Sequence, residues 1–254
     1  MQKITSTKKT PSVKINNLSV KINGKKILSS INMTWKPGKT YAIIGPNGSG
    51  KSTLAHTIAA HPDIKIDTNS TITFGNKNIT KQTAQHRAKL GIFVSFQSPP
   101  PLPGVTIKQL LRLATKTTHS ARELQKKIHD EAEKLNIDKN LLQRPMNVDF
   151  SGGEKKKMET LQAMVITPKI LILDEIDTGV DVDALKNITK AIKRLQKENN
   201  TTVIIITHNH ALLKKIIPDE VVVLKDGKIA QKGTVQILTT ITQKGYAHIG
   251  QQNA

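Results

Sequence analysis

Glycine, lysine and hydroxyl side chains are concentrated in one short stretch, residues 45–53, directly after the apolar segment 41–44. The glycines let the backbone take turn conformations closed to residues with a Cβ, so that successive amides can point at phosphate oxygens. The sequence that follows can start a helix, whose N-terminus adds a positive dipole and unpaired N–H groups. The stretch therefore predicts a phosphate-binding loop formed by Gly45, Pro46, Asn47, Gly48, Ser49, Gly50, Lys51, Ser52 and Thr53.

Two carboxylates complement this loop. Lys51 is placed to reach the β- and γ-phosphates of a nucleotide and the Ser52 hydroxyl to ligate Mg²⁺, as the pattern G-x-x-x-x-G-K-[ST] requires. Asp174 and Glu175 follow the apolar run 170–173, which as a buried strand would present them at its C-terminal edge. We expect Asp174 to be a Mg²⁺ partner opposite Ser52, and Glu175 to be the base that orients or deprotonates the attacking water.

A second anion-binding helix start lies at Ser151, Gly152 and Gly153. Ser151 is a good N-cap, and the glycines expose backbone amides. One nucleotide does not need two such cradles from the same chain. We therefore expect this segment to serve the nucleotide of another subunit.

The elements around these groups can be predicted from hydrophobic spacing. Residues 13–35 alternate about an Asn23-Gly24 turn, which is typical of an antiparallel sheet. Apolar residues between 106 and 147 recur at helical spacing, and beyond residue 151 strands alternate with helices of ten or more residues. This predicts an α/β fold with a mixed or parallel sheet core, an N-terminal antiparallel β subdomain and an inserted helical subdomain. We expect one domain over 1–254, with a frayed tail at 1–11, an α/β core at 12–97 and 151–254, and the helical subdomain at 98–150.

Six motifs occur in the order found in ABC-type ATPases, which the chain resembles over nearly its whole length. They are Gly45–Ser52, Gln97 after a strand, Ser151–Glu154, Leu173–Glu175, Thr178–Asp181 and Thr207-His208. The resemblance implies a P-loop ATPase of the ABC type that uses ATP and Mg²⁺.

The resemblance also assigns roles to single residues. It makes Gln97 the Q-loop residue that senses Mg²⁺ and couples to a partner, and 151–153 the signature that completes the opposite subunit's site. Asp181 becomes the D-loop aspartate across the dimer seam. His208, just past the predicted strand 203–207, becomes the switch histidine that contacts the γ-phosphate; without the motif, an exposed or helix-capping histidine would be the usual interpretation.

Two features lie outside this scheme. His56, His61 and His119 belong to no motif, and we expect them to be ordinary surface residues. The first hairpin offers residues 20–23, Val-Lys-Ile-Asn, where ABC transporters commonly stack adenine on an aromatic ring. Losing such stacking costs about 1–3 kcal/mol, so we expect modest nucleotide affinity.

Within the ABC superfamily the chain resembles SufC, the ATPase family of the SUF iron–sulfur cluster assembly system. The carrying segments are Gly91–Phe93, Phe96–Pro99, Pro103–Val105, Phe150–Lys156 with Glu159 and Leu161-Gln162, Asp174–Lys186 and Lys244–Tyr246. Ile176 and Thr178 differ conservatively from the usual Thr and Ser of that family, and the strong positive charge is also unlike a typical member.

The SufC resemblance implies a subunit that binds the scaffold proteins SufB and SufD and reshapes them by transient, ATP-dependent pairing of two ATPases. The alternative is the ATPase subunit of a membrane transporter, whose coupling helices would dock in the same Q-loop groove. A third interpretation is a nucleic-acid-associated ABC ATPase. Those usually carry paired ATPase domains or a long coiled-coil insertion, and neither is visible in this sequence.

Composition sets the remaining limits. The 254 residues include no cysteine, which excludes disulfides and thiolate ligation and fits a cluster held by partners. No apolar run reaches the roughly 18 residues that cross a bilayer, so we expect a soluble, cytoplasmic protein, with an organelle stroma left open. The formal charge of +20 is spread in pairs with only 3% aromatic residues. We attribute it to lysine-rich composition before an acidic partner or nucleic acid, which remain alternatives.

Overall fold

The computed structural model describes residues 10–115 and 120–249. The N-terminal part contains β1 (Val13–Ile22), β2 (Lys25–Trp35), β3 (Thr40–Ile44), α1 (Lys51–Ala59), β4 (Lys65–Ile66), β5 (Thr71–Phe74), β6 (Lys77–Asn78), α2 (Ala84–Leu90) and β7 (Ile92–Ser95). The middle part contains β8 (Leu102–Thr106), α3 (Ile107–Ala114), α4 (Ala121–Lys134), the 3-10 helix η1 (Lys139–Leu142) and β9 (Pro145–Met146). The C-terminal part contains α5 (Gly152–Ile166), β10 (Ile170–Asp174), α6 (Val182–Asn199), β11 (Thr202–Ile206), α7 (His210–Lys215), β12 (Glu220–Lys225), β13 (Lys228–Gly233), α8 (Ile237–Lys244) and the 3-10 helix η2 (Tyr246–His248).

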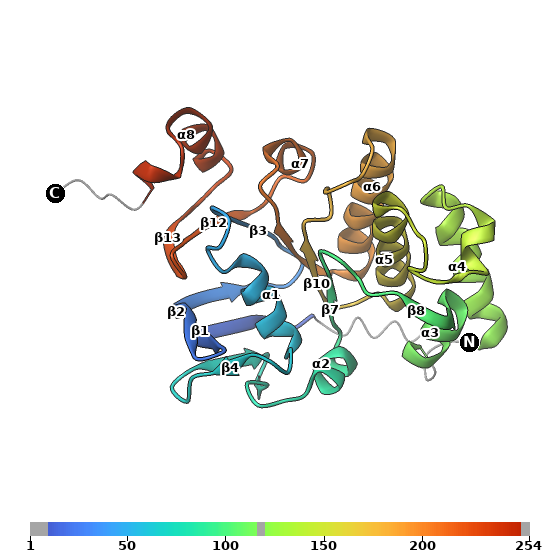
Figure 1. The fold of residues 1–254 in the computed structure, drawn as a ribbon, viewed down its shortest axis with the longest axis horizontal. Coiled ribbons are helices and arrows are strands. Elements are labelled where there is room, and N and C mark those ends of the chain that lie inside the picture. The colour runs from blue at the N-terminus through green and yellow to red at the C-terminus, as the bar shows by residue number, and fades with distance from the viewer. Residues whose placement is uncertain (1–9, 116–119, 250–254) are drawn as a thin grey trace, which may run out of the picture.

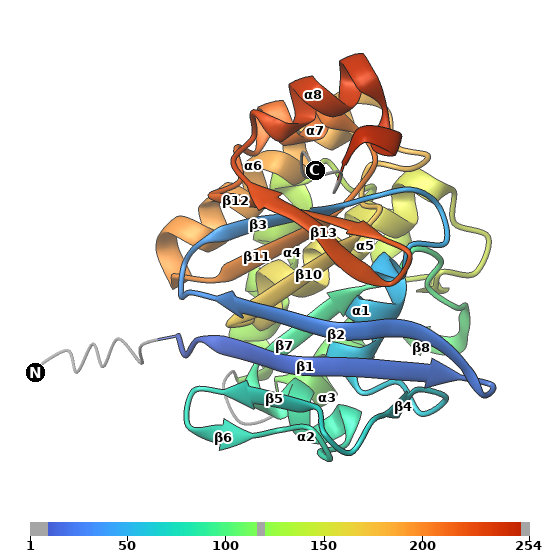
Figure 2. The same cartoon turned by 90° about the vertical axis from the view of Figure 1, so that its left-hand side faces the viewer.

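A six-stranded sheet in the order β13-β12-β3-β11-β10-β7 forms the centre of the molecule (Figure 2). All neighbours pair in parallel except β13, which is antiparallel to β12. Strands β3, β10 and β11 are buried along their whole length, because both faces of the sheet are covered. The carboxyl ends of β3 and β10 therefore open at one edge, directly before the phosphate loop and Glu175.

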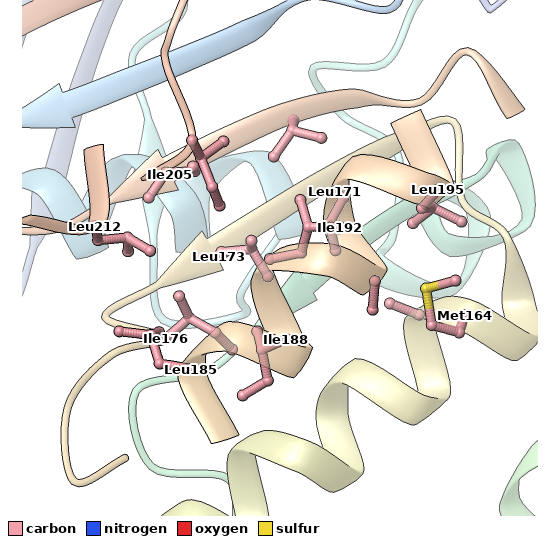
Figure 3. Packing of buried hydrophobic residues seen from close by; sticks show 14 of the residues in the cluster. Met164, Leu171, Leu173, Ile176, Leu185, Ile188, Ile192, Leu195, Ile205 and Leu212 are labelled. Atoms are coloured by element: carbon pink, nitrogen blue, oxygen red, sulfur yellow. The ribbon is translucent and has the colours of Figure 1, made fainter. Parts of the chain in front are cut away.

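Alternate residues of the central strands face two different hydrophobic cores, as the pleat requires. Leu171 and Leu173 of β10 face the core formed with α5 and α6, whereas Ile170 and Ile172 face the other. Figure 3 shows the first core, where one stripe of α6 lies against β10. Its members at helical spacing are Leu185, Ile188, Ile192 and Leu195.

A second, antiparallel sheet is formed by the N-terminal strands, in the order β2-β1-β5-β6 with β4 also on β1. β1 and β2 are joined at Asn23-Gly24, both at positive φ, as the turn dipeptide predicts. Helix α1 packs between the two sheets through Leu54, Ala55 and Ile58 (Figure 2). The fold class expected from the sequence is confirmed by this architecture.

The segment 98–150 carries α3 and α4, which lie at the end of the molecule away from β1 and β2 (Figure 1). Thr106 and Ser120 cap these helices, each in a capping box with the residue three positions later. We expected only helices here, but β8 pairs with β9 and closes the base of the segment. The proline-rich 98–104 thus leads into a strand.

Other differences concern short or hidden elements. β13 was not expected; it forms a hairpin with β12 through Asp226-Gly227, a dipeptide that is itself a hairpin signal. The expected frayed tail at 1–11 falls almost entirely outside the described residues. In the described ranges, none of the helices combines the length and apolarity needed to cross a membrane.

Candidate nucleotide site

Segments far apart in the sequence line one open cleft of about 510 Å³. Its walls come from the phosphate loop, the start of α1, β2, the loop after β7, the end of β10 and the loop after β11. The lining residues are Ile27, Asn47, Gly48, Gly50, Lys51, Ser52, Thr53, Gln97, Glu175 and His208. Sequence reasoning selected every one of these except Ile27.

The phosphate loop wraps tightly between strand and helix. Gly45 has φ +154°, and a Cβ there would lie 2.0 Å from the Leu224 carbonyl oxygen, so no other residue fits. Gly50 precedes α1 with φ +98°. The Lys51 ammonium donates hydrogen bonds to the carbonyls of Gly45 (3.0 Å) and Pro46 (2.9 Å). These are bonds that nucleotide phosphates can replace, and burial lowers the pKa of Lys51 while Glu175 and Asp174 oppose this.

Asp174 is fully buried, and neither of its carboxylate oxygens has a hydrogen-bond partner among the described residues. Burial raises its pKa; the neighbouring Ser52 hydroxyl opposes this, although no hydrogen bond of ordinary length joins the two side chains. A buried carboxylate without partners is an incomplete arrangement that a cation would complete. Asp174 and Ser52 thus fit Mg²⁺, whose other ligands in such sites are phosphate oxygens and water. Among the described residues, no group of three or more His, Cys, Asp or Glu side chains is placed to hold a metal ion.

Glu175 adopts a left-handed backbone conformation, with φ +51°. Its N–H donates to the Ile206 carbonyl (2.9 Å), which continues the β10–β11 ladder while turning the side chain into the cleft. Its carboxylate accepts from Gln97 Nε2 (2.5 Å) and lies 3.5 Å from His208 Nδ1. A non-glycine residue held at positive φ costs about 1–3 kcal/mol, and such strain is typical of functional positions.

The loop that carries His208 is fixed by its neighbours. Thr207 is fully buried; its hydroxyl donates to Asp177 (3.0 Å) and accepts from the Asn209 N–H (2.8 Å). Asn209 then caps α7. His208 itself keeps 60% of its side chain exposed, so it can reach a ligand in the cleft.

Two groups of predicted site residues lie outside this cleft. Ser151 caps α5 in a capping box with Glu154, and a Cβ on Gly152 would lie 3.5 Å from the Gly179 carbonyl. Asp181 is exposed and caps α6 by accepting from the Ala184 N–H (2.7 Å). Gly153 also lies beside Gly179. The structure therefore brings the signature and D-loop segments to each other, and not to the phosphate loop of the same chain.

The sequence pattern of the family described as "ABC transporter" matches residues 28–178, more than half of the chain. The chain belongs to this ABC ATPase family. It is therefore an ATP-binding cassette that hydrolyses ATP and uses Mg²⁺. The matched residues run from β2 through the phosphate loop and the inserted helices to Thr178.

Several relatives are similar over almost the whole ABC ATPase. The "probable ATP-dependent transporter ycf16" of Antithamnion sp. is 41% identical over 243 residues, covering 92% of this chain and 96% of the relative. "Vegetative protein 296" of Bacillus subtilis (strain 168) is 39% identical over 244 residues, covering 94% and 93%. A "probable ABC transporter ATP-binding protein" of Streptococcus pyogenes serotype M18 is 38% identical over 245 residues, covering 94% and 95%.

Solved structures share the fold of this ABC ATPase. A dimeric ATP-binding cassette described as a post-hydrolysis state with ADP and phosphate superposes with a TM-score of 0.76 at 22% identity, covering 88% of this chain and 98% of that one. A nucleotide-free cassette of an ABC transporter gives a TM-score of 0.74 at 24% identity, covering 92% and 96%.

Sequence reasoning missed some residues of this ABC ATPase that surround the site. Lys156 and Glu159 lie three positions apart on α5 and both are buried, which no local sequence pattern indicates. The expectation that His56 is a surface residue was incomplete: it is half-buried, and its ring lies 5.4 Å from His61 and 5.7 Å from Phe96 between centroids. Burial lowers the pKa of His56. His119 lies outside the described residues.

Proposed function

We propose that this ABC ATPase is the ATP-hydrolysing subunit of an iron–sulfur cluster assembly system, acting on a scaffold of SufB- and SufD-like proteins. Support comes from the SufC-like segments and from the position of one of them. Residues 96–104 directly follow strand β7, and Phe96, Gln97 and Ser98 are exposed beside the cleft. This exposed, proline-rich segment is the observation that carries the partner assignment, since it offers a stiff surface next to the nucleotide.

In the proposed mechanism the phosphate loop and Lys51 hold the β- and γ-phosphates of ATP. Ser52 and Asp174 would hold Mg²⁺, with Gln97 close by, and the bound ion would supply positive charge to the phosphate oxygens. Glu175 orients the attacking water and accepts its proton. We assign His208 to the γ-phosphate from its place in the Thr207-His208 motif, and its Nδ1 lies 3.5 Å from the Glu175 carboxylate in the same cleft.

The signature residues enter the mechanism from a second copy of the chain. Ser151, Gly152 and Gly153 stand at the start of α5, where they are exposed or half-exposed and do not line the cleft of their own subunit. In a dimer these amides would close over the partner's γ-phosphate, and Asp181 would lie at the seam. ATP would thus bring two subunits together, and hydrolysis would release them. Such a cycle would take place in the cytoplasm or an organelle stroma.

Co-purification with a SufB–SufD complex tests the partner. Pro101→Glu and Ser98→Glu put a charge on the exposed segment and should abolish capture, with basal hydrolysis unchanged. Thr68→Glu, a change at an exposed position in the turn between β4 and β5, is the matched control and should bind like the parent. Moderate salt is needed so that the charge of +20 does not cause nonspecific adhesion.

If the Ser98 and Pro101 variants are captured as well as the parent, segment 96–104 is not the surface that binds the scaffold. Its prolines then only connect β7 to the helical segment. The second candidate is an ATPase subunit of a membrane transporter, favoured by the names of the Antithamnion and Streptococcus relatives. Capture of the parent by a permease, with none by the scaffold pair, would establish that alternative. A nucleic-acid role has less support, because few aromatic residues accompany the lysines.

A further inference from the structure

Phe96, the residue before Gln97, is held on three sides. Its N–H donates to Glu159 Oε1 (2.8 Å), and its carbonyl accepts from Lys156 Nζ (2.6 Å). Both partners belong to α5. The Phe96 ring lies against His56 of α1, the helix that starts at the phosphate loop.

Lys156 and Glu159 form a buried ion pair whose polar atoms bond to neighbouring residues. Lys156 and Glu159 are only 3% and 4% exposed, and their charged atoms lie 3.6 Å apart. Glu159 also accepts from the Ser95 hydroxyl (2.8 Å), and Lys156 lies 3.4 Å from the Asp174 carbonyl. Burying two charges is costly, and an apolar pair is often equally stable. Stability alone therefore does not account for this pair.

The placement of the pair links the parts of the active site. Helix α5 begins at the signature residues Gly152 and Gly153, and Lys156 and Glu159 lie within its first two to three turns. Because both polar groups of the Phe96 backbone are fixed to α5, a shift of the signature end of this helix must move Phe96. Gln97 follows immediately, and its amide contacts the Glu175 carboxylate.

We propose that Lys156 and Glu159 are positioning residues for ATP hydrolysis, which couple the signature end of α5 to Gln97 through the Phe96 backbone. They act without touching the nucleotide. This inference goes beyond the proposed function and rests only on the ATPase reaction, so it does not depend on which partner the protein has.

A double-mutant cycle tests the coupling in the full chain. Lys156→Met/Glu159→Leu removes both charges with little change in volume, which keeps the fold where a single change would leave a buried unpaired charge. It is combined with Gln97→Ala, and each variant is measured for kcat, KM for ATP, equilibrium binding of a fluorescent ATP analogue, and Tm. Glu131→Leu/Arg194→Met, which removes a part-buried ion pair between α4 and α6 away from the cleft, is the matched control.

We expect the Lys156/Glu159 double variant to lose at least tenfold in kcat with KM and analogue binding within threefold of the parent. Adding Gln97→Ala should cost less than threefold more, since both changes remove the same arrangement. The control pair should keep parental kcat whatever its Tm. The proposal is overturned if the folded double variant keeps kcat within twofold of the parent, or if the effects of the two changes multiply. It is equally overturned if the control pair loses as much kcat as the Lys156/Glu159 variant.

Discussion

At the scale of single residues, Asp174 is fully buried, and its carboxylate oxygens have no hydrogen-bond partner among the described residues. This arrangement suits the binding of a cation but lowers the stability of the protein without one. Because burial raises its pKa above the ordinary 3.8, the folded state holds the proton more tightly than the unfolded chain. Its stabilising contribution is therefore fully present below the unfolded pKa and is lost as pH rises through the folded one. At pH values above the folded pKa, the ionised Asp174 destabilises the nucleotide-free protein.

Asp174→Asn should consequently raise the free energy of unfolding at pH 7 by about 1–3 kcal/mol without nucleotide or Mg²⁺, while ATP hydrolysis is lost. Tm measured against pH should show this gain shrinking as pH falls toward 4. Asp181→Asn keeps its capping bond and is exposed, so it should give no gain. An equal Tm for the Asp174 variant and the parent at pH 7 would contradict this account of the buried carboxylate.

Glu175→Gln and Lys51→Ala separate chemistry from binding. The Gln side chain keeps its shape but cannot accept a proton, so ATP binding should persist while turnover falls by at least 100-fold. An ATP-bound dimer should then accumulate in size-exclusion chromatography.

Lys51→Ala removes the positive charge that contacts the phosphates and should weaken nucleotide binding itself. Parental nucleotide affinity in the Lys51 variant would refute its assigned role.

At the scale of elements, the turn of the β12–β13 hairpin contacts two of the segments that line the cleft. Gly227 in its turn accepts from the Ser29 N–H (2.8 Å) and donates to the Ser49 carbonyl (3.3 Å) of the phosphate loop. A Cβ on Gly227 would lie 2.1 Å from the Ile27 carbonyl oxygen, and Ile27 lines the cleft. The turn therefore ties β13 to both β2 and the phosphate loop.

Gly227→Ala should destabilise the protein by about 1–3 kcal/mol and weaken nucleotide binding. Gly24→Ala is a close control: Gly24 is also a hairpin-turn glycine at positive φ (+77°), but a Cβ there meets nothing within 4 Å. Denaturant unfolding and nucleotide titration of both variants measure the difference. Equal losses in the two would mean that backbone strain alone, and not contact with β2, sets the cost.

The sequence predicted those elements whose signal is local. Apolar runs indicated β3, β10 and β11, and the glycine pattern indicated the phosphate loop and thereby Lys51. The pairing of β8 with β9 joins Leu102 to Met146 and Thr106 to Pro145, on either side of α3 and α4. It depends on contacts between distant residues that no local pattern encodes. The same reason hid Lys156 and Glu159, because a charged pair on a helix is usually solvated. Here distant residues bury the pair, among them Ser95, Phe96 and Asp174.

At the scale of the whole molecule, the signature lies apart from the cleft of its own chain, so activity should depend on encounter between subunits. Specific ATPase activity per subunit should rise with protein concentration and fall on dilution, with sedimentation run in parallel to give the dimer fraction. A dilute, demonstrably monomeric sample with the same rate per subunit as a concentrated one would refute the shared site.

The burial of the central strands on both faces has a further consequence for where motion is tolerated. β3, β10 and β11 each pair with a strand on both sides, and both faces of the sheet are covered. We therefore expect their amide protons to exchange with solvent only when the whole protein unfolds. The phosphate loop and Glu175 extend from these strands. Helices α3 and α4 of segment 98–150 lie outside this sheet and pack against α5, and an ion pair joins Glu131 of α4 to Arg194 of α6. We therefore expect the phosphate loop and Glu175 to keep their backbone positions when other parts of the protein open locally.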